Sequence, residues 1–155
     1  EMTSLGFEDA LNPYEPVKAE IACVLTGGCF VTEKDPFTRM VTQVKDKCVL
    51  GYKYFDFGED TSTVTMEFAL KIFGAGCRGK LHVMIDAPTA DKGGQEIGVV
   101  DIDTRDGVYR ARVKNVTGRH ALYLVAELNK PHNEWMSNFF EGRSICDVEE
   151  FVFMK

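Results

Sequence analysis

Residues 79–89 read Gly79-Lys80-Leu81-His82-Val83-Met84-Ile85-Asp86-Ala87-Pro88-Thr89, an alternating run followed by a polar turn. Because successive side chains of a strand point to opposite faces, Leu81, Val83 and Ile85 share one face and the residues between them share the other. Similar runs and turns recur along the chain, and no long helical pattern interrupts them. The sequence therefore predicts an all-β protein, an antiparallel β-sandwich of the jelly-roll type.

The alternating runs predict about nine strands at short spacing. They cover residues 17–25, 40–44, 48–55, 64–73, 80–86, 97–102, 109–113, 120–128 and 148–153. Residues 32–39 are polar and are predicted to form a loop, and a second long loop is predicted for residues 129–144. Pro13 and Pro16 disfavour regular structure near the start of the chain. Residues 1–13 are therefore predicted to be a linker or arm from a preceding domain, and residues 14–155 the sandwich.

Composition excludes several classes of protein. The chain has 155 residues, 45% of them hydrophobic, and a net charge of -6. It is long enough for one domain with its own core, and the acidic balance without a basic stripe argues against a nucleic-acid partner. No apolar run approaches the ~20 residues of a membrane span. The chain begins with Glu1 rather than Met, so we expect a piece excised from a longer protein.

The cysteines do not form a zinc motif or a disulfide framework. There are five of them, Cys23, Cys29, Cys48, Cys77 and Cys146, and no Cys-x-x-Cys pair. An odd number without such pairs favours buried thiols. A single disulfide is the alternative, with Cys23 and Cys29 the nearest pair in sequence.

Enzyme motifs are missing from the sequence. It contains no Gly-x-Ser-x-Gly and no His-Glu-x-x-His segment, and these segments mark common hydrolase sites. His82 lies within a predicted strand and His120 opens another, so both are interpreted as structural. The chain by itself is therefore predicted not to be an enzyme.

Five segments in order along the chain resemble family 6 carbohydrate-binding modules, specifically those appended to family 43 glycoside hydrolases. The segments are 11–20 (LNPYEPVKAE), 41–58 (VTQVKDKCVLGYKYFDFG, ending in Phe55-Asp56-Phe57-Gly58), 80–89 (KLHVMIDAPT), 115–125 (NVTGRHALYLV) and 147–153 (DVEEFVF). The resemblance implies a non-catalytic, sugar-binding β-sandwich attached to the catalytic domain of a plant-polysaccharide enzyme. It also implies an extracellular or periplasmic location and xylan-type or other β-glucan ligands.

The same resemblance implies a binding cleft between the loops at one end of the sandwich. In such a cleft aromatic rings stack on the apolar faces of a sugar, and polar groups fix its hydroxyls. Gln43 stands where the first ring is usual, Tyr109 is the candidate for the second, and Asp147 replaces the usual Asn. Trp135, the only Trp, lies in the long loop before Asp147. It is predicted to rebuild the stacking platform; alternatively it holds that loop or docks on a catalytic domain.

A structural calcium ion between the first and last strands is also implied by the resemblance. Calcium prefers oxygen ligands, including carboxylates. Glu20 and Glu149 take the positions of two usual acidic residues, and they are the predicted ligands. Lys18 stands in place of another acid, so an ion pair that replaces the metal is the alternative.

The sequence leads to two hypotheses of function. The first is a module that binds hemicellulose (xylan, arabinoxylan or another β-glucan) and keeps an attached hydrolase near its substrate. The second is an accessory domain that has lost sugar binding and packs on its catalytic partner. The usual stacking rings are not matched, which favours the second hypothesis.

Overall fold

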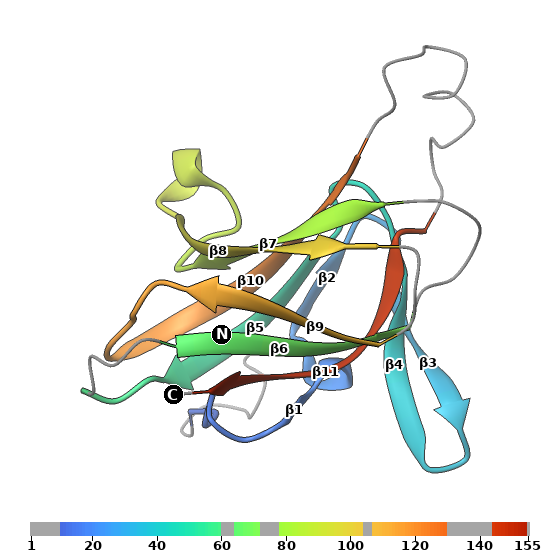
Figure 1. The fold of residues 1–155 in the computed structure, drawn as a ribbon, viewed down its shortest axis with the longest axis horizontal. Helices are drawn as coiled ribbons and strands as arrows, with labels where there is room; N and C mark the ends of the chain where they lie inside the picture. The colour runs from blue at the N-terminus through green and yellow to red at the C-terminus, as the bar shows by residue number, and fades with distance from the viewer. Residues whose placement is uncertain (1–9, 60–63, 72–77, 104–106, 130–143, 155) are drawn as a thin grey trace.

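The computed structural model describes residues 10–59, 64–71, 78–103, 107–129 and 144–154. In this part of the chain two antiparallel sheets lie face to face (Figure 1). One sheet follows the order β3 (Phe30–Asp35), β4 (Thr38–Val44), β11 (Cys146–Met154), β6 (Val64–Lys71) and β9 (Gly107–Val113), with β1 (Val17–Lys18) also paired to β11. The second follows β2 (Val24–Thr26), β5 (Val49–Asp56), β10 (Arg119–Leu128), β7 (Gly79–Ile85) and β8 (Gln95–Ile102). The predicted all-β sandwich is confirmed.

The alternation that predicted the strands is also what builds the core. Along β10, Leu122, Leu124 and Ala126 are buried between the sheets, whereas the residues between them belong to the outer face of the five-stranded sheet. Strand β10 pairs with β5 on one side and β7 on the other. The stretch 79–89 therefore contributes a strand next to the centre of this sheet, as the alternation indicates.

Aromatic rings from β5, β11 and the residues just after β5 join the two sheets. Tyr52 contacts Phe151 edge to face at a centroid distance of 5.0 Å, and Phe57 contacts Phe153 in the same way at 5.2 Å. Phe55 lies between these pairs, 6.1 Å from Phe151. The Tyr52 hydroxyl is completely buried and donates to the Ala19 carbonyl oxygen at 2.9 Å. Such rings bury much apolar area and prefer these tilted contacts.

The first predicted strand, residues 17–25, is wrong as a single element. The chain forms β1, a 3₁₀ turn η1 (Ala19–Ile21), and then β2. Strand β1 pairs with β11 in one sheet and β2 pairs with β5 in the other. The chain has to cross between the sheets here, so a continuous strand cannot form. The turn is closed by the Ala22 amide, which donates to the Ala19 carbonyl at 3.2 Å.

The predicted loop 32–39 is also wrong, because most of it belongs to a β-hairpin. Strands β3 and β4 pair through residues 30–42. Asp35 Oδ1 accepts hydrogen bonds from the amides of Phe37 and Thr38, at 2.8 and 2.9 Å, which is the turn chemistry Asp favours. The hairpin projects from the body of the sandwich (Figure 1). Both of its faces meet solvent near the turn, so no apolar alternation is needed there.

Residues 10–13 pack against the sandwich. Leu11 is 9% exposed, and its amide donates to the Tyr54 carbonyl at 2.7 Å. The carbonyl of Pro13 accepts a hydrogen bond from the Phe153 amide at 2.8 Å. This part of the predicted arm is therefore attached to β5 and β11, and residues 1–9 lie outside the described residues.

We expect Phe151→Ala to lower the free energy of unfolding by about 3–5 kcal/mol, because it removes ring contacts to Tyr52 and Phe55 of the opposite sheet and leaves a cavity. Phe37→Ala is the matched control, since that ring is 95% exposed at the hairpin turn. The free energy of unfolding of Phe37→Ala should differ from that of the wild type by no more than about 0.5 kcal/mol. Urea denaturation measures both, and equal effects of the two substitutions would contradict the assigned core.

Candidate functional site

Gln43 and Asp147, two of the predicted sugar-binding residues, lie beside each other on β4 and β11. Cys146 pairs with Val44 and Val148 with Val41, so two residues of β4 face one residue of β11. Gln43 sits in this bulge with a φ of 60°. Asp147 is 1% exposed, and its Oδ1 accepts a hydrogen bond from Thr42 Oγ1 at 2.7 Å. This carboxylate is therefore buried against its neighbour strand.

Tyr109 does not join these two residues. It pairs with Phe68 of β6, which in turn pairs with Phe151, four positions from Asp147 along β11. Its ring is half-buried and packs against the core, and its hydroxyl donates to the Asp103 carbonyl at 3.3 Å. Trp135, the fourth predicted residue, lies outside the described residues. The predicted cleft thus stays a prediction.

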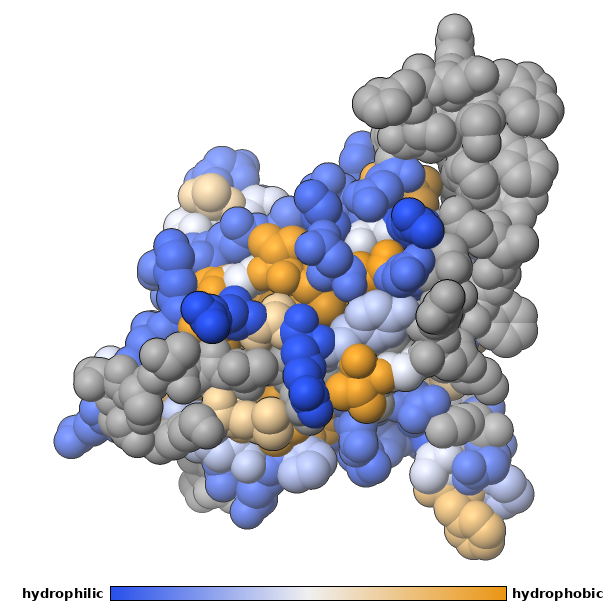
Figure 2. All heavy atoms as spheres, in the orientation of Figure 1, coloured by the Kyte–Doolittle hydropathy of each residue, from blue (hydrophilic) through white to orange (hydrophobic). Residues whose placement is uncertain are grey.

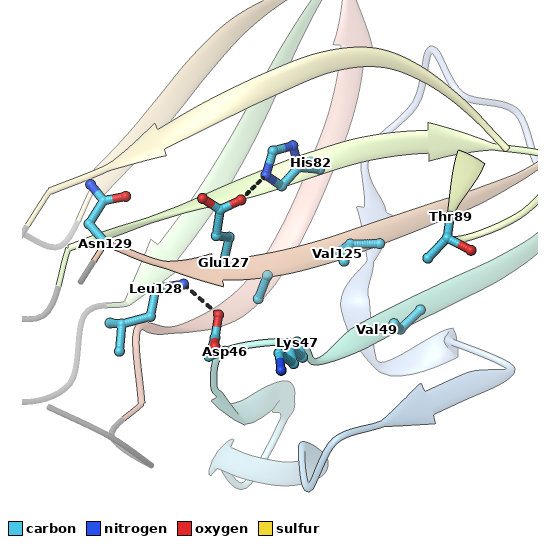
Figure 3. A pocket seen from close by; sticks show the side chains of 10 residues that line it. Asp46, Lys47, Val49, His82, Thr89, Val125, Glu127, Leu128 and Asn129 are labelled. Atoms are coloured by element: carbon cyan, nitrogen blue, oxygen red, sulfur yellow. Dashed lines mark hydrogen bonds and ion pairs between the residues drawn. The ribbon is translucent and has the colours of Figure 1, made fainter. Parts of the chain in front are cut away.

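A pocket of about 810 Å³ lies on the outer face of the five-stranded sheet (Figure 3). Its outward-facing apolar residues are Val49 of β5 and Val125 of β10, and the core residues Ala126 and Leu128 at the end of β10 border it. Its polar residues are Asp46, Lys47, His82, Thr89, Glu127 and Asn129. Asp46 and Lys47 belong to the β4–β5 turn, and Thr89 follows β7. The pocket is therefore made by a sheet face and by two connections that the sequence does not place together.

The β4–β5 turn is held against the end of β10. Asp46 accepts a hydrogen bond from the Leu128 amide at 2.9 Å (Figure 3), and the Lys47 amide donates to the Ala126 carbonyl at 2.8 Å. Lys47 has a φ of 68°, a left-handed conformation that marks a tight turn. These bonds fix the Asp46 carboxylate and the Lys47 backbone at one end of the pocket.

His82 connects three strands at the edge of this pocket. It lies on β7 between Val125 of β10 and Val99 of β8. Its Nε2 is hydrogen-bonded to Glu127 Oε2 at 2.8 Å, and its Nδ1 to the Glu96 carboxylate. Burial lowers the pKa of His82, but the bonds and charges of Glu96 and Glu127 outweigh it and raise the pKa above its ordinary value. The structural interpretation of His82 is consistent with these bonds, although the residue also lines the pocket.

The outer face beyond the pocket carries two rings, Tyr54 and Tyr123, that are not among the predicted site residues. Tyr123 packs with Met84 and Ala121, and Tyr54 lies against this cluster. The Arg119 guanidinium lies over the Tyr54 ring, 5.0 Å from its centroid. The signal was present in the alternation of β10, which puts Tyr123, Val125 and Glu127 on the face opposite to Leu122 and Leu124. What the alternation does not show is which connections border that face.

Glu20 and Glu149, the predicted calcium ligands, line one small pocket of about 230 Å³ between η1, β4 and β11. Glu150, Lys18 and Arg39 line it too. Lys18 forms an ion pair with Glu150 at 2.9 Å, and Arg39 lies 3.9 Å from Glu20. Calcium takes about six to eight oxygen ligands, and two cationic side chains in so small a pocket oppose it. The residues present therefore fit the alternative, an ion-pair cluster, better than the metal.

Among the described residues no group of three His, Cys, Asp or Glu side chains is arranged to hold a metal ion. Calcium binding stays a prediction from the resemblance. No helix in the same part of the chain is both long and apolar enough to cross a membrane.

Solved structures establish which fold this is. No protein-family model matches the chain, and no curated protein sequence matches it. A family 6 carbohydrate-binding module from Clostridium cellulolyticum, in complex with xylose, matches with a TM-score of 0.71 at 18% identity, over 94% of this chain and 100% of that one. A β-1,3-glucan-binding module of the same family from Bacillus halodurans has a TM-score of 0.69 at 21% identity, over 95% and 100%.

The fold also occurs as part of a larger enzyme. A family 43 arabinoxylan arabinofuranohydrolase from Bacillus subtilis, in complex with cellotetraose, matches with a TM-score of 0.69 at 17% identity. The match covers 96% of this chain and 28% of that enzyme. The chain thus has the β-sandwich fold of family 6 carbohydrate-binding modules, and the resemblance seen in the sequence is confirmed for the fold.

We expect His82 to contribute stability that depends on pH. Its pKa in the folded protein is raised above the ordinary value of 6.5, so the contribution is fully present below about pH 6.5 and is lost as the pH rises through the folded pKa. The melting temperature of His82→Gln should therefore lie below that of the wild type at low pH and approach it as the pH rises above the folded pKa of His82. The double variant Glu96→Gln/Glu127→Gln should show the same loss of pH dependence. A gap that is constant with pH would contradict the assignment.

The ion-pair cluster predicts how calcium affects stability. We expect neither calcium nor EDTA to shift the melting temperature of the wild type, because Lys18 and Arg39 supply the positive charge in the pocket. The variant Lys18→Gln/Arg39→Gln leaves three carboxylates there, and its melting temperature should rise when calcium is added. Differential scanning calorimetry checks both predictions. A lower melting temperature of the wild type in EDTA would support calcium binding and contradict the ion-pair cluster.

Proposed function

We propose that this protein is a non-catalytic carbohydrate-binding module that binds hemicellulose and holds an attached glycoside hydrolase near its substrate. The observation that carries the proposal is the end-to-end match to a module in complex with xylose. The match inside an arabinoxylan arabinofuranohydrolase supports the attachment to a hydrolase. Such attachment raises the local concentration of substrate without new chemistry. It implies an extracellular or periplasmic protein whose partner is plant cell-wall polysaccharide.

The pocket on the five-stranded sheet has the chemistry that a sugar needs. Its apolar floor of Val49 and Val125 suits the C–H face of a pyranose, and Glu127, Asn129 and Lys47 offer acceptors and donors for hydroxyls. A volume of about 810 Å³ lies within the range of small-molecule sites and is large enough for more than one sugar unit. We therefore include this pocket in the proposal beside the predicted cleft of Trp135, Asp147, Tyr109 and Gln43.

Affinity electrophoresis on xylan, arabinoxylan and β-1,3-glucan tests the function. We expect retardation on at least one of these polysaccharides. Glu127→Ala combined with Asn129→Ala should weaken it if the sheet pocket binds, and Trp135→Ala if the predicted cleft binds. Arg112→Ala is the control, because its exposed side chain lies on β9 of the other sheet. Absence of retardation on all three would contradict sugar binding.

The second candidate function is an accessory domain that packs on a catalytic domain, and one observation favours it. The hairpin of β3 and β4 projects from the body, and the space-filling view shows apolar surface at its outer end (Figure 2). Phe37 is 95% exposed at the hairpin turn, and Phe30, at the start of β3, is 52% exposed. Aromatic residues of this kind are enriched at protein interfaces. An accessory role would bury them against the neighbouring domain.

Limited proteolysis distinguishes the accessory role. In a protein that joins this chain to its hydrolase domain, we expect the β3–β4 hairpin to be protected if it packs on that domain, and Phe37→Ser to remove the protection. In the sugar-binding role the hairpin is cleaved equally with and without the hydrolase domain.

A further inference from the structure

Two cysteines lie together where the chain twice crosses between the sheets. Cys29 belongs to the connection from β2 to β3, and Cys48 to the connection from β4 to β5. Strands β2 and β5 belong to the five-stranded sheet, whereas β3 and β4 belong to the other. A covalent bond between these cysteines would therefore join the two crossings to each other.

The contacts around the thiols show how close these crossings are. Cys48 Sγ donates to the Gly27 carbonyl at 3.2 Å, and Cys29 Sγ to the adjacent Thr26 carbonyl at 3.4 Å. Each thiol also shifts the pKa of the other, so the two side chains lie beside each other. Gly27 has a φ of 89°, and a Cβ there would lie 2.9 Å from Cys48 Sγ. A glycine at this position is what lets the first crossing pass directly over the second cysteine.

We propose that Cys29 and Cys48 form a disulfide when the protein meets an oxidising compartment. The oxidant is a small-molecule disulfide. A thiolate of the pair attacks it and releases one small thiol, which leaves a mixed disulfide. The second cysteine then loses its proton and attacks the mixed disulfide, releasing the other small thiol. The pair gives up two protons and two electrons, and the small disulfide is reduced to two thiols.

The proximity of the two thiols also favours the ionisation of one of them. Cys29 lowers the pKa of the Cys48 thiol to about 6, against the effect of burial, and Cys48 raises the pKa of Cys29. Thiolates, not thiols, attack disulfides. Cys48 is therefore the more readily ionised thiol of the pair. By contrast, burial raises the pKa of Cys146, and Cys23 Sγ donates to the Gly51 carbonyl at 3.6 Å.

Peptide mapping after equilibration of the full chain in a glutathione redox buffer tests the proposal. We expect a peptide pair linked through Cys29 and Cys48, with the other three cysteines open to alkylation after unfolding. The melting temperature should rise by about 5–10 °C on oxidation, because the bond closes a loop of intermediate length.

Single cysteine variants distinguish the Cys29–Cys48 disulfide from other cysteine pairings. Cys29→Ser should abolish the link and the shift in melting temperature on oxidation, whereas Cys23→Ser and Cys146→Ser should retain both. Because Cys48 is completely buried, the mapping of the wild type, and not Cys48→Ser alone, decides its role. A link between Cys23 and Cys29, a link from Cys48 to Cys146, or five alkylated cysteines would overturn the proposal.

Discussion

The contact between the rings of the β5 segment and the rings of β11 is the interaction on which the rest of the structure depends. Tyr52 and Phe57 meet Phe151 and Phe153 edge to face across the space between the sheets. The buried Tyr52 hydroxyl also fixes the turn at Ala19. Large side chains of the described residues fill this layer. The two pockets described above lie outside it, at a sheet face and beside the connections between strands.

The sequence predicted those parts of the fold that period-two alternation specifies. Residues 80–86 and 120–128 alternate over their whole length and became β7 and β10. Residues 17–25 alternate less clearly, and their pairing with two different sheets depends on β11 and β5, which are far away in sequence. The β3–β4 hairpin was missed for a different reason. It projects into solvent, and a strand with two exposed faces has the composition of a loop.

The candidate site was less predictable than the fold because it is assembled from separate elements. Alternation places Val125 and Glu127 on an outer face, but nothing local shows that Asp46 and Lys47 close one end of that face. Those positions follow from hydrogen bonds between the β4–β5 turn and the end of β10. The resemblance directed attention to the strand ends instead, where Asp147 is buried against Thr42 and Trp135 lies outside the described residues. Charge shows the same limitation: the sequence does not show that Lys18 forms an ion pair with Glu150.

His82 shows how one side chain serves both the stability of the sheet and the chemistry of the pocket. A protonated imidazole has two N–H donors, one for Glu96 and one for Glu127, and it joins β8 and β10 through β7. A neutral imidazole has only one N–H, so one of the two carboxylates then loses its donor. Glu127 lines the pocket and Glu96 does not. If the proposed sugar binds in this pocket, a hydroxyl that donates to Glu127 would compensate for the lost bond, and binding would be coupled to the protonation of His82 through this carboxylate.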